Sequence, residues 1–133
     1  MAVVTRDTRA HYDASTAALA FQISGLIAGE DINAGEAAYI KAADGKIYRS
    51  LGAAANEAAK VDGFSPRDAK AGQALTLYGR GTRFRWATGL TPGANLYLGA
   101  AVGTLDTAPT TGGLVPIARA IDGTDIRIIN DAV

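Results

Sequence analysis

Apolar and polar residues alternate in several short runs along the chain, as they do in β-strands that bury one face. The clearest runs lie at residues 19–23, 37–41, 74–78, 82–86 and 125–129. Turn residues separate such runs at intervals of roughly 8–12 residues, which is typical of sandwiches and barrels. The pattern predicts an all-β fold, a compact β-sandwich or barrel (jelly-roll-like) of about 8–10 short strands.

One short sequence motif occurs three times: a glycine, then small or polar residues, then a strand pattern that ends on a large aliphatic residue. The copies lie at 34–40, 71–77 and 92–98, and Pro92 precedes the glycine of the last copy. Because proline presets φ near −65° and glycine accepts positive φ, the motif predicts a turn that leads into a strand. The copies are unevenly spaced and the sequence between them does not repeat, so a solenoid or propeller is not predicted.

Turn residues and a proline refine the prediction at two places. The Asp-Gly pair at 44–45 lies between apolar runs, which is the strongest short-range signal for a hairpin, so we expect paired strands at 37–41 and 47–49. The apolar run at 114–121 contains Pro116. A proline cannot donate to a neighbouring strand, so this run is predicted to be an edge strand or to contain a bulge.

The segment from 50 to 61 has a different pattern. Leu51 and four alanines, at 54, 55, 58 and 59, recur at helical spacing. Alanine favours helix, so we predict at most one short helix or a single helical turn here, crossing between the two sheets. Val61 and Phe64 follow it and are expected to return to the core.

The length of 133 residues suits one domain with a substantial core. Residues 1–18 carry two charges of each sign and few apolar side chains, and are read as an extended N-terminal arm. A frayed terminus is the commoner explanation of such a segment, and an arm that reaches a neighbouring subunit is the functional one. Residues 19–133 are read as a single β domain.

Composition excludes several classes of protein. Thirteen basic residues balance 13 acidic ones, which argues against a general nucleic-acid binder. Cysteine is absent, so disulfides and thiolate metal sites are excluded. No apolar run reaches 18 residues and none near the N-terminus has the length of a signal peptide, so we expect no membrane span and synthesis in the cytoplasm.

The chain shows no recognisable catalytic set. His11 is the sole histidine and lies in the predicted arm, which leaves no nucleophile–base pair and no zinc ligand set. The carboxylates considered for acid–base chemistry all lie in or beside turn signals: Asp31, Glu36, Asp44, Asp62 and Asp68. Carboxylates in turns usually accept backbone amides. We therefore expect no enzyme, no catalytic residue, no cofactor and no metal.

The run at 82–86 holds the most distinctive side chains. Strict alternation places Arg83 and Arg85 on one face of a strand and Phe84 and Trp86 on the other. Opposite faces do not suit nucleic-acid binding, which combines arginines with stacking rings. Solvated arginines over a packed aromatic pair are the plainer interpretation. The alternative is that both arginines face an acidic partner protein, because arginine is enriched at interfaces.

Several stretches together resemble a known family. They are Val61-Asp62-Gly63-Phe64 and the runs 71–77, 89–98, 115–121 and 125–128. Over about residues 32–129 the chain resembles the head decoration, or cement, proteins of tailed bacteriophages. The resemblance implies a virion structural protein without catalytic residues. After synthesis in the host cytoplasm it would bind the major capsid protein on the outer capsid surface and stabilise the expanded head.

The same resemblance implies a homo-oligomer. A trimer fits three-fold sites of a capsid and is preferred to a dimer, which fits two-fold sites. The residues expected at partner interfaces are Val3, Val4, Arg6 and Arg9 of the arm, and Arg83 and Arg85. An alternative function is a tail-fibre or baseplate-associated β domain that binds a host glycan. In that case an aromatic side chain, Trp86, Tyr78 or Tyr97, would contact the sugar.

Overall fold

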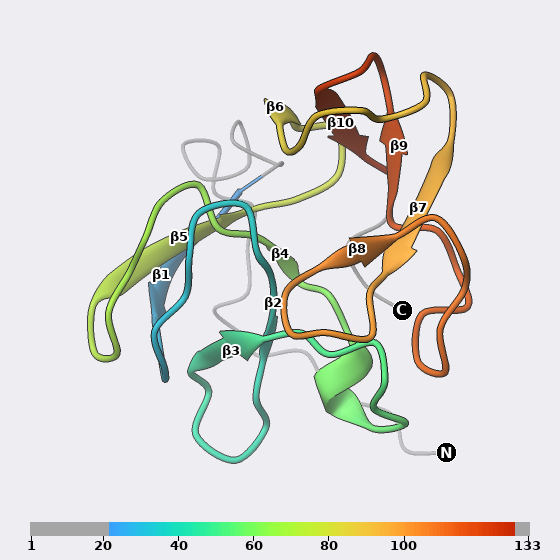
Figure 1. Ribbon diagram of the computed structural model, residues 1–133. Coiled ribbons are helices and arrows are strands. Elements are labelled where there is room, and N and C mark those ends of the chain that lie inside the picture. The colour runs from blue at the N-terminus through green and yellow to red at the C-terminus, as the bar shows by residue number, and fades with distance from the viewer. Residues whose placement is uncertain (1–21, 130–133) are drawn as a thin grey trace, which may run out of the picture.

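The computed structural model describes residues 22–129, which form ten β-strands and one 3-10 turn (Figure 1). The first five strands are β1 Gln22–Ile27, β2 Ala37–Ile40, β3 Ile47–Arg49, β4 Gly63–Phe64 and β5 Ala74–Tyr78. The others are β6 Arg83–Arg85, β7 Asn95–Leu98, β8 Leu105–Asp106, β9 Ala118–Ala120 and β10 Asp125–Ile128. They build two antiparallel sheets, which confirms the predicted all-β, sandwich-like fold. The predicted arm at 1–18, with Val3, Val4, Arg6 and Arg9, lies outside the described residues.

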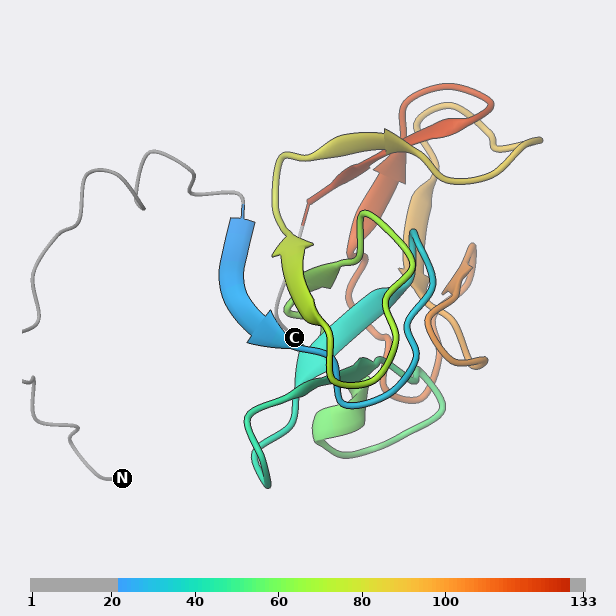
Figure 2. The ribbon, with the colours of Figure 1, turned by 90° about the vertical axis from the view of Figure 1, so that its left-hand side faces the viewer.

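The two sheets repeat one strand order. The order is β1-β5-β4-β2-β3 in the first sheet and β6-β10-β9-β7-β8 in the second. The two orders become identical when five is subtracted from each strand number of the second sheet, so β6 occupies the position of β1 and β10 that of β5. One half of the chain, 22–78, therefore builds one sheet and the other half, 83–128, builds the other (Figures 1 and 2). Over the described residues 22–129 the chain passes between the sheets once, at 79–82, which is a simpler path than that of a jelly roll.

Equivalent glycine turns lead into equivalent strands of the two sheets. Strands β2 and β7 each begin two residues after a glycine, Gly35 with φ +83° and Gly93 with φ +82°. Strands β3 and β8 likewise follow Gly45 and Gly103, with φ +70° and +69°. Gly72, in the remaining copy of the repeated motif, has φ +88° and precedes β5. Side chains disfavour such φ values, so glycine fixes where these strands begin.

The segment 50–61 forms a single 3-10 turn, η1 Glu57–Ala59, as the alanine spacing predicted. Asn56 caps the start of this turn, and its side chain accepts a hydrogen bond from the backbone N–H of Ala58. The prediction that this segment crosses between the sheets is wrong. It joins β3 to β4, which lie on either side of β2 in the same sheet, so it needs to span only one strand.

The prediction of an edge strand or bulge at 114–121 is also wrong. Strand β9 begins after Pro116 and lies in the interior of its sheet, between β10 and β7. Proline lacks an N–H, and pairing accordingly starts at the next residue, where the Ile117 N–H donates to the Leu96 carbonyl at 2.9 Å. The proline therefore marks the start of a central strand.

The core has one part inside each half and one part between them. The cluster between the sheets combines Val61 and Phe64 with Leu98, Ile117 and Ile128, all fully or almost fully buried. The expected return of Val61 and Phe64 to the core is thus confirmed, and the Phe64 ring lies 5.8 Å from that of Phe84 in the second sheet. Burial of these side chains joins the two sheets.

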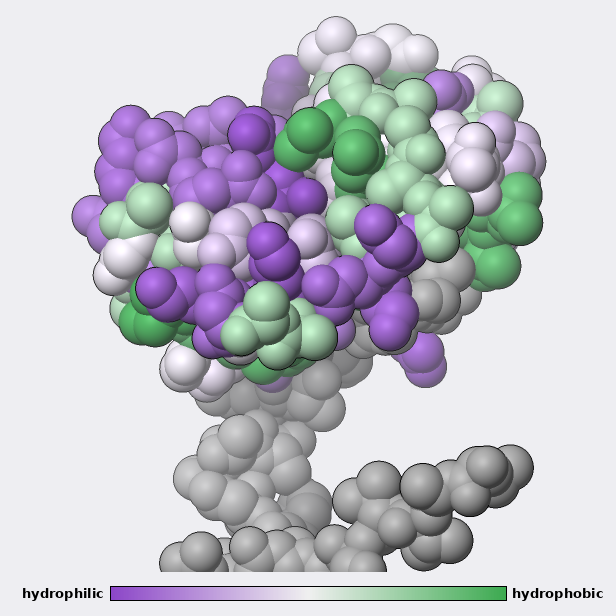
Figure 3. Space-filling model, turned by 90° about the horizontal axis from the view of Figure 1, so that it is seen from below, coloured by the Kyte–Doolittle hydropathy of each residue, from purple (hydrophilic) through white to green (hydrophobic). Residues whose placement is uncertain are grey.

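Each half also holds a core of its own. The first contains Ile32, Ile47, Leu75 and Leu77. A single parallel bridge between Ala28 and Ile47 links the end of β1 to β3, so this sheet curls on itself. At the end of the molecule viewed in Figure 3, hydrophilic residues gather at the upper left and apolar residues at the upper centre and right, while both kinds are mixed along the lower edge of the coloured surface.

Candidate functional site

Strand β6 presents the predicted alternation. Arg83 and Arg85 are exposed, whereas Phe84 and Trp86 are half-buried and pack against the core of the second half. The Trp86 indole N–H donates to the Gly35 carbonyl at 2.8 Å and so ties this strand to the first half. Alternation within one strand was visible in the sequence, and the predicted facing of these four side chains is confirmed.

Adjacent strands extend the exposed side of β6 into a row of arginines. Arg83 of β6 lies opposite Arg127 of β10, which in turn lies opposite Arg119 of β9. All three are exposed. Like charges directly opposite each other on neighbouring strands are destabilising. We call Arg83, Arg85, Arg119 and Arg127 the arginine face.

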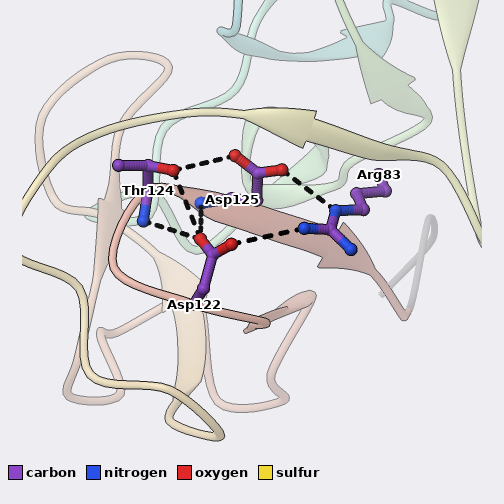
Figure 4. Close-up of polar contacts among 4 residues, drawn as sticks. All are labelled: Arg83, Asp122, Thr124 and Asp125. Atoms are coloured by element: carbon purple, nitrogen blue, oxygen red, sulfur yellow. Dashed lines mark hydrogen bonds and ion pairs between the residues drawn. The ribbon is translucent and has the colours of Figure 1, made fainter.

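Counter-charges within the chain neutralise this face only in part. Arg83 donates from Nε to Asp125 at 2.9 Å and from a terminal nitrogen to Asp122 at 3.3 Å (Figure 4). Arg119 donates to a neutral group, the Gly93 carbonyl, at 3.1 Å. Among residues 22–129, neither Arg85 nor Arg127 has an ion-pair partner. The face therefore keeps an excess of positive charge, although the whole chain is neutral.

Asp122 holds the turn that positions these groups. Its Oδ1 accepts the backbone N–H of Thr124 at 2.9 Å and that of Asp125 at 2.8 Å (Figure 4). These backbone hydrogen bonds, helped by the Thr124 hydroxyl and the Arg83 charge, lower the pKa of Asp122 below its ordinary 3.8. The same carboxylate thus orders the β9–β10 turn and orients Arg83.

A pH-dependent contribution to stability follows. A carboxylate with a lowered pKa stabilises the fold above its ordinary pKa, and this stabilisation is lost as the pH falls through the folded-state value. We expect Asp122→Asn to destabilise the protein at pH 6 and to have little effect at a pH below the folded-state pKa. Urea unfolding of both proteins between pH 6 and pH 2 measures this difference. A difference that stays constant over that range would contradict the assignment.

The choice of basic residue differs between the two halves. All four lysines of the chain lie between residues 41 and 70, whereas each basic residue after Tyr78 is an arginine. Arginine is enriched and lysine depleted at protein–protein interfaces, because a planar guanidinium is weakly hydrated and binds carboxylates through two parallel hydrogen bonds. The arginine face thus consists of the basic residue type that is enriched at interfaces.

A cleft of about 530 Å³ lies where β6 meets the first half of the chain. Tyr78, Phe84 and Trp86 contribute aromatic rings to its lining, and Glu36 and Arg85 contribute charged groups. Tyr97, on β7, does not line it. The structure therefore brings together Trp86 and Tyr78 of the three aromatic residues considered for sugar binding.

The five carboxylates considered for catalysis accept backbone N–H groups, as predicted for turn residues. The backbone N–H donors are those of Ala71 to Asp31, Asn33 to Glu36, Lys46 to Asp44, Ile40 to Asp62 and Ala34 to Asp68. Among residues 22–129, no three His, Cys, Asp or Glu side chains are grouped so that they could hold a metal ion. No helix in that range is long and apolar enough to cross a membrane.

Sequence reasoning missed Arg119 and Arg127. Each sits between buried residues, in Ala118-Arg119-Ala120 and in Ile126-Arg127-Ile128, so its exposure was readable from alternation. Their position beside Arg83 was not readable, because it depends on strand order and register. Comparison of the chain with known proteins finds no matching family, no similar curated protein and no similar solved structure.

Proposed function

We propose that this chain is a structural protein that binds an acidic surface of another protein through the arginine face. The observation that carries this proposal is the row of Arg83, Arg127 and Arg119 on three adjacent strands. A row of like charges weakens the sheet that bears it, so an acidic partner relieves a cost that the fold imposes. Complementary charge also speeds association and fixes the orientation of the partner.

Within that class, we propose a head decoration protein of a tailed bacteriophage that attaches to the outer surface of the expanded capsid. The support is the resemblance described from the sequence, together with an all-β fold whose resembling stretches supply strands and turns. A protein that binds only the expanded shell stabilises that shell by mass action. The arginine face would then contact acidic residues of the major capsid protein, and the chain would act as an oligomer, with a trimer preferred.

Cryo-electron microscopy of the parent particle tests this function directly. We expect density for residues 22–129 on the outside of the capsid, with β6, β9 and β10 toward the shell. Density at the tail tip instead, or absence of the chain from purified particles, would exclude a decoration role.

Charge reversal tests the surface. We expect Arg85→Glu combined with Arg127→Glu to reduce occupancy on purified expanded heads by about tenfold or more, because two unneutralised cations become anions facing an acidic partner. Lys46→Glu combined with Lys60→Glu is the matched control, since it changes the net charge equally at two exposed positions of the first half. Quantitative gel analysis of pelleted heads gives the occupancy. Equal losses in both double variants would show a non-specific charge effect.

A further inference from the structure

Strand β6 has an unpaired edge. Within residues 22–129 it pairs only with β10. The Trp86 N–H donates to the Thr124 carbonyl at 2.9 Å, and the Thr82 carbonyl accepts from Ile128 at 3.0 Å. In an antiparallel pair alternate residues bond to the same neighbour, so the backbone N–H and C=O groups of Arg83 and Arg85 point away from β10.

This unpaired edge borders open space. The cleft of about 530 Å³ is lined on one side by Thr82, Phe84, Arg85 and Trp86, and on the other by residues of the first half that include Tyr78. An extended chain that lies along β6 would therefore meet free backbone donors and acceptors beside a cavity. Added strands of this kind bind through main-chain hydrogen bonds, while pockets for alternate side chains supply specificity.

The two faces of β6 determine which side chains such a strand needs. Side chains on the side of Arg83 and Arg85 would lie next to guanidinium groups, which favours glutamate or aspartate. Side chains on the opposite side would enter the cleft beside the rings of Phe84, Trp86 and Tyr78, which favours apolar residues. Successive residues of a strand point to opposite faces, so acidic and apolar residues must alternate.

We propose that the free edge of β6 binds an extended segment of the partner protein in which acidic and apolar residues alternate. The inference rests on the proposed function, because it names the part of the acidic partner that is recognised. A second copy of this strand does not fit, since it would set arginine against arginine. Residues 1–18 of the chain do not fit either, because their charges include as many basic as acidic groups.

A saccharide suits the cleft less well than a peptide strand. It would leave the backbone groups of Arg83 and Arg85 without strand partners. The Trp86 indole N–H, a common donor to ligands, is already bonded to the Gly35 carbonyl. A peptide strand satisfies the backbone groups and needs only the ring surfaces of the cleft.

The first test uses a capped octapeptide of alternating glutamate and valine, titrated into the full ¹⁵N-labelled chain and followed by NMR. We expect saturable shifts of the backbone amides of Arg83 and Arg85 and of the Trp86 indole signal. An octapeptide of alternating lysine and valine should bind at least about tenfold more weakly, since it sets cations against the arginines. Absence of saturable binding overturns the proposal.

Two substitutions at position 85 distinguish the contribution of the backbone N–H to peptide binding from that of the guanidinium charge. Arg85→Ala removes the guanidinium but keeps the N–H, and should weaken peptide binding about two- to fivefold, the range for an exposed ion pair. Arg85→Pro also removes the N–H, at an edge position where proline is tolerated, and should weaken binding about tenfold or more. Equal affinities of these two variants, both confirmed as folded by their amide spectra, would remove the role of the backbone.

The location of the shifts decides between this proposal and simpler ones. Shifts confined to Arg119 and Arg127 would assign the peptide to the arginine face alone and overturn edge pairing. Shifts of Trp86 with a mixture of bacterial oligosaccharides, but not with the acidic peptide, would assign the cleft to a sugar. If the chain is found on phage heads but its β6 edge does not bind the peptide, the proposed function is supported and the proposal of edge pairing is overturned. If the peptide binds but the chain is absent from particles, edge pairing stands and the decoration role falls.

Discussion

Replacing Phe64 by alanine is expected to lower the free energy of unfolding by about 3–5 kcal/mol, the usual range for a buried phenylalanine. Phe64 is 1% exposed, and its ring packs 5.8 Å from that of Phe84 across the space between the sheets. The substitution leaves a cavity at the place where the two halves of the chain are joined. Both sheets therefore lose packing at once.

Urea unfolding followed by the fluorescence of Trp86, the sole tryptophan, measures this loss. Leu114→Ala is the control: it also truncates a large aliphatic side chain, but one that is 70% exposed, so a change within about 0.5 kcal/mol is expected. Similar losses in the two variants would mean that Phe64 does not join the sheets as described.

Gly52→Ala is the second substitution with a large expected effect, about 2–4 kcal/mol of lost stability. A Cβ at Gly52 would lie 2.4 Å from the carbonyl oxygens of both Leu98 and Gly99. These are backbone atoms, which have little freedom to move aside. The Gly52 N–H donates to the Gly99 carbonyl at 2.8 Å and the Gly52 carbonyl accepts from the Gly112 N–H at 2.7 Å, so moving these loops apart also breaks hydrogen bonds between the halves.

Gly123→Ala provides the matched control, because the nearest heavy atom to its added Cβ is 3.9 Å away, at ordinary van der Waals contact. Thermal unfolding monitored by circular dichroism compares the two variants with the parent protein. We expect a clear drop in Tm for Gly52→Ala and little change for Gly123→Ala. Unchanged stability of Gly52→Ala would show that the two loops are not in close contact.

Local patterns in the sequence were sufficient to predict many of the strands. The strands observed at 37–40, 47–49 and 74–78 were predicted within one residue, because alternation and turn chemistry are properties of neighbouring residues. The turn glycines Gly35, Gly72 and Gly93 were identified for the same reason. The crossover assigned to 50–61 was wrong, because strand order depends on contacts between residues far apart in the chain.

The candidate site divides in the same way. Arg83 and Arg85 were found because alternation within β6 exposes them. The residues that neutralise Arg83 come 39 and 42 positions later, and no local signal pairs Asp122 and Asp125 with it. The cleft joins β6 to segments of the first half, so it too follows from the tertiary fold and not from any one stretch of sequence.

Between residues 22 and 129 the chain passes from one sheet to the other at a single place, which makes this part of the molecule divisible. A cut within 79–82 would leave each of the two fragments with a complete set of strand partners. The fragments would remain joined by the Phe64–Phe84 contact, the Trp86–Gly35 hydrogen bond and the backbone bonds around Gly52.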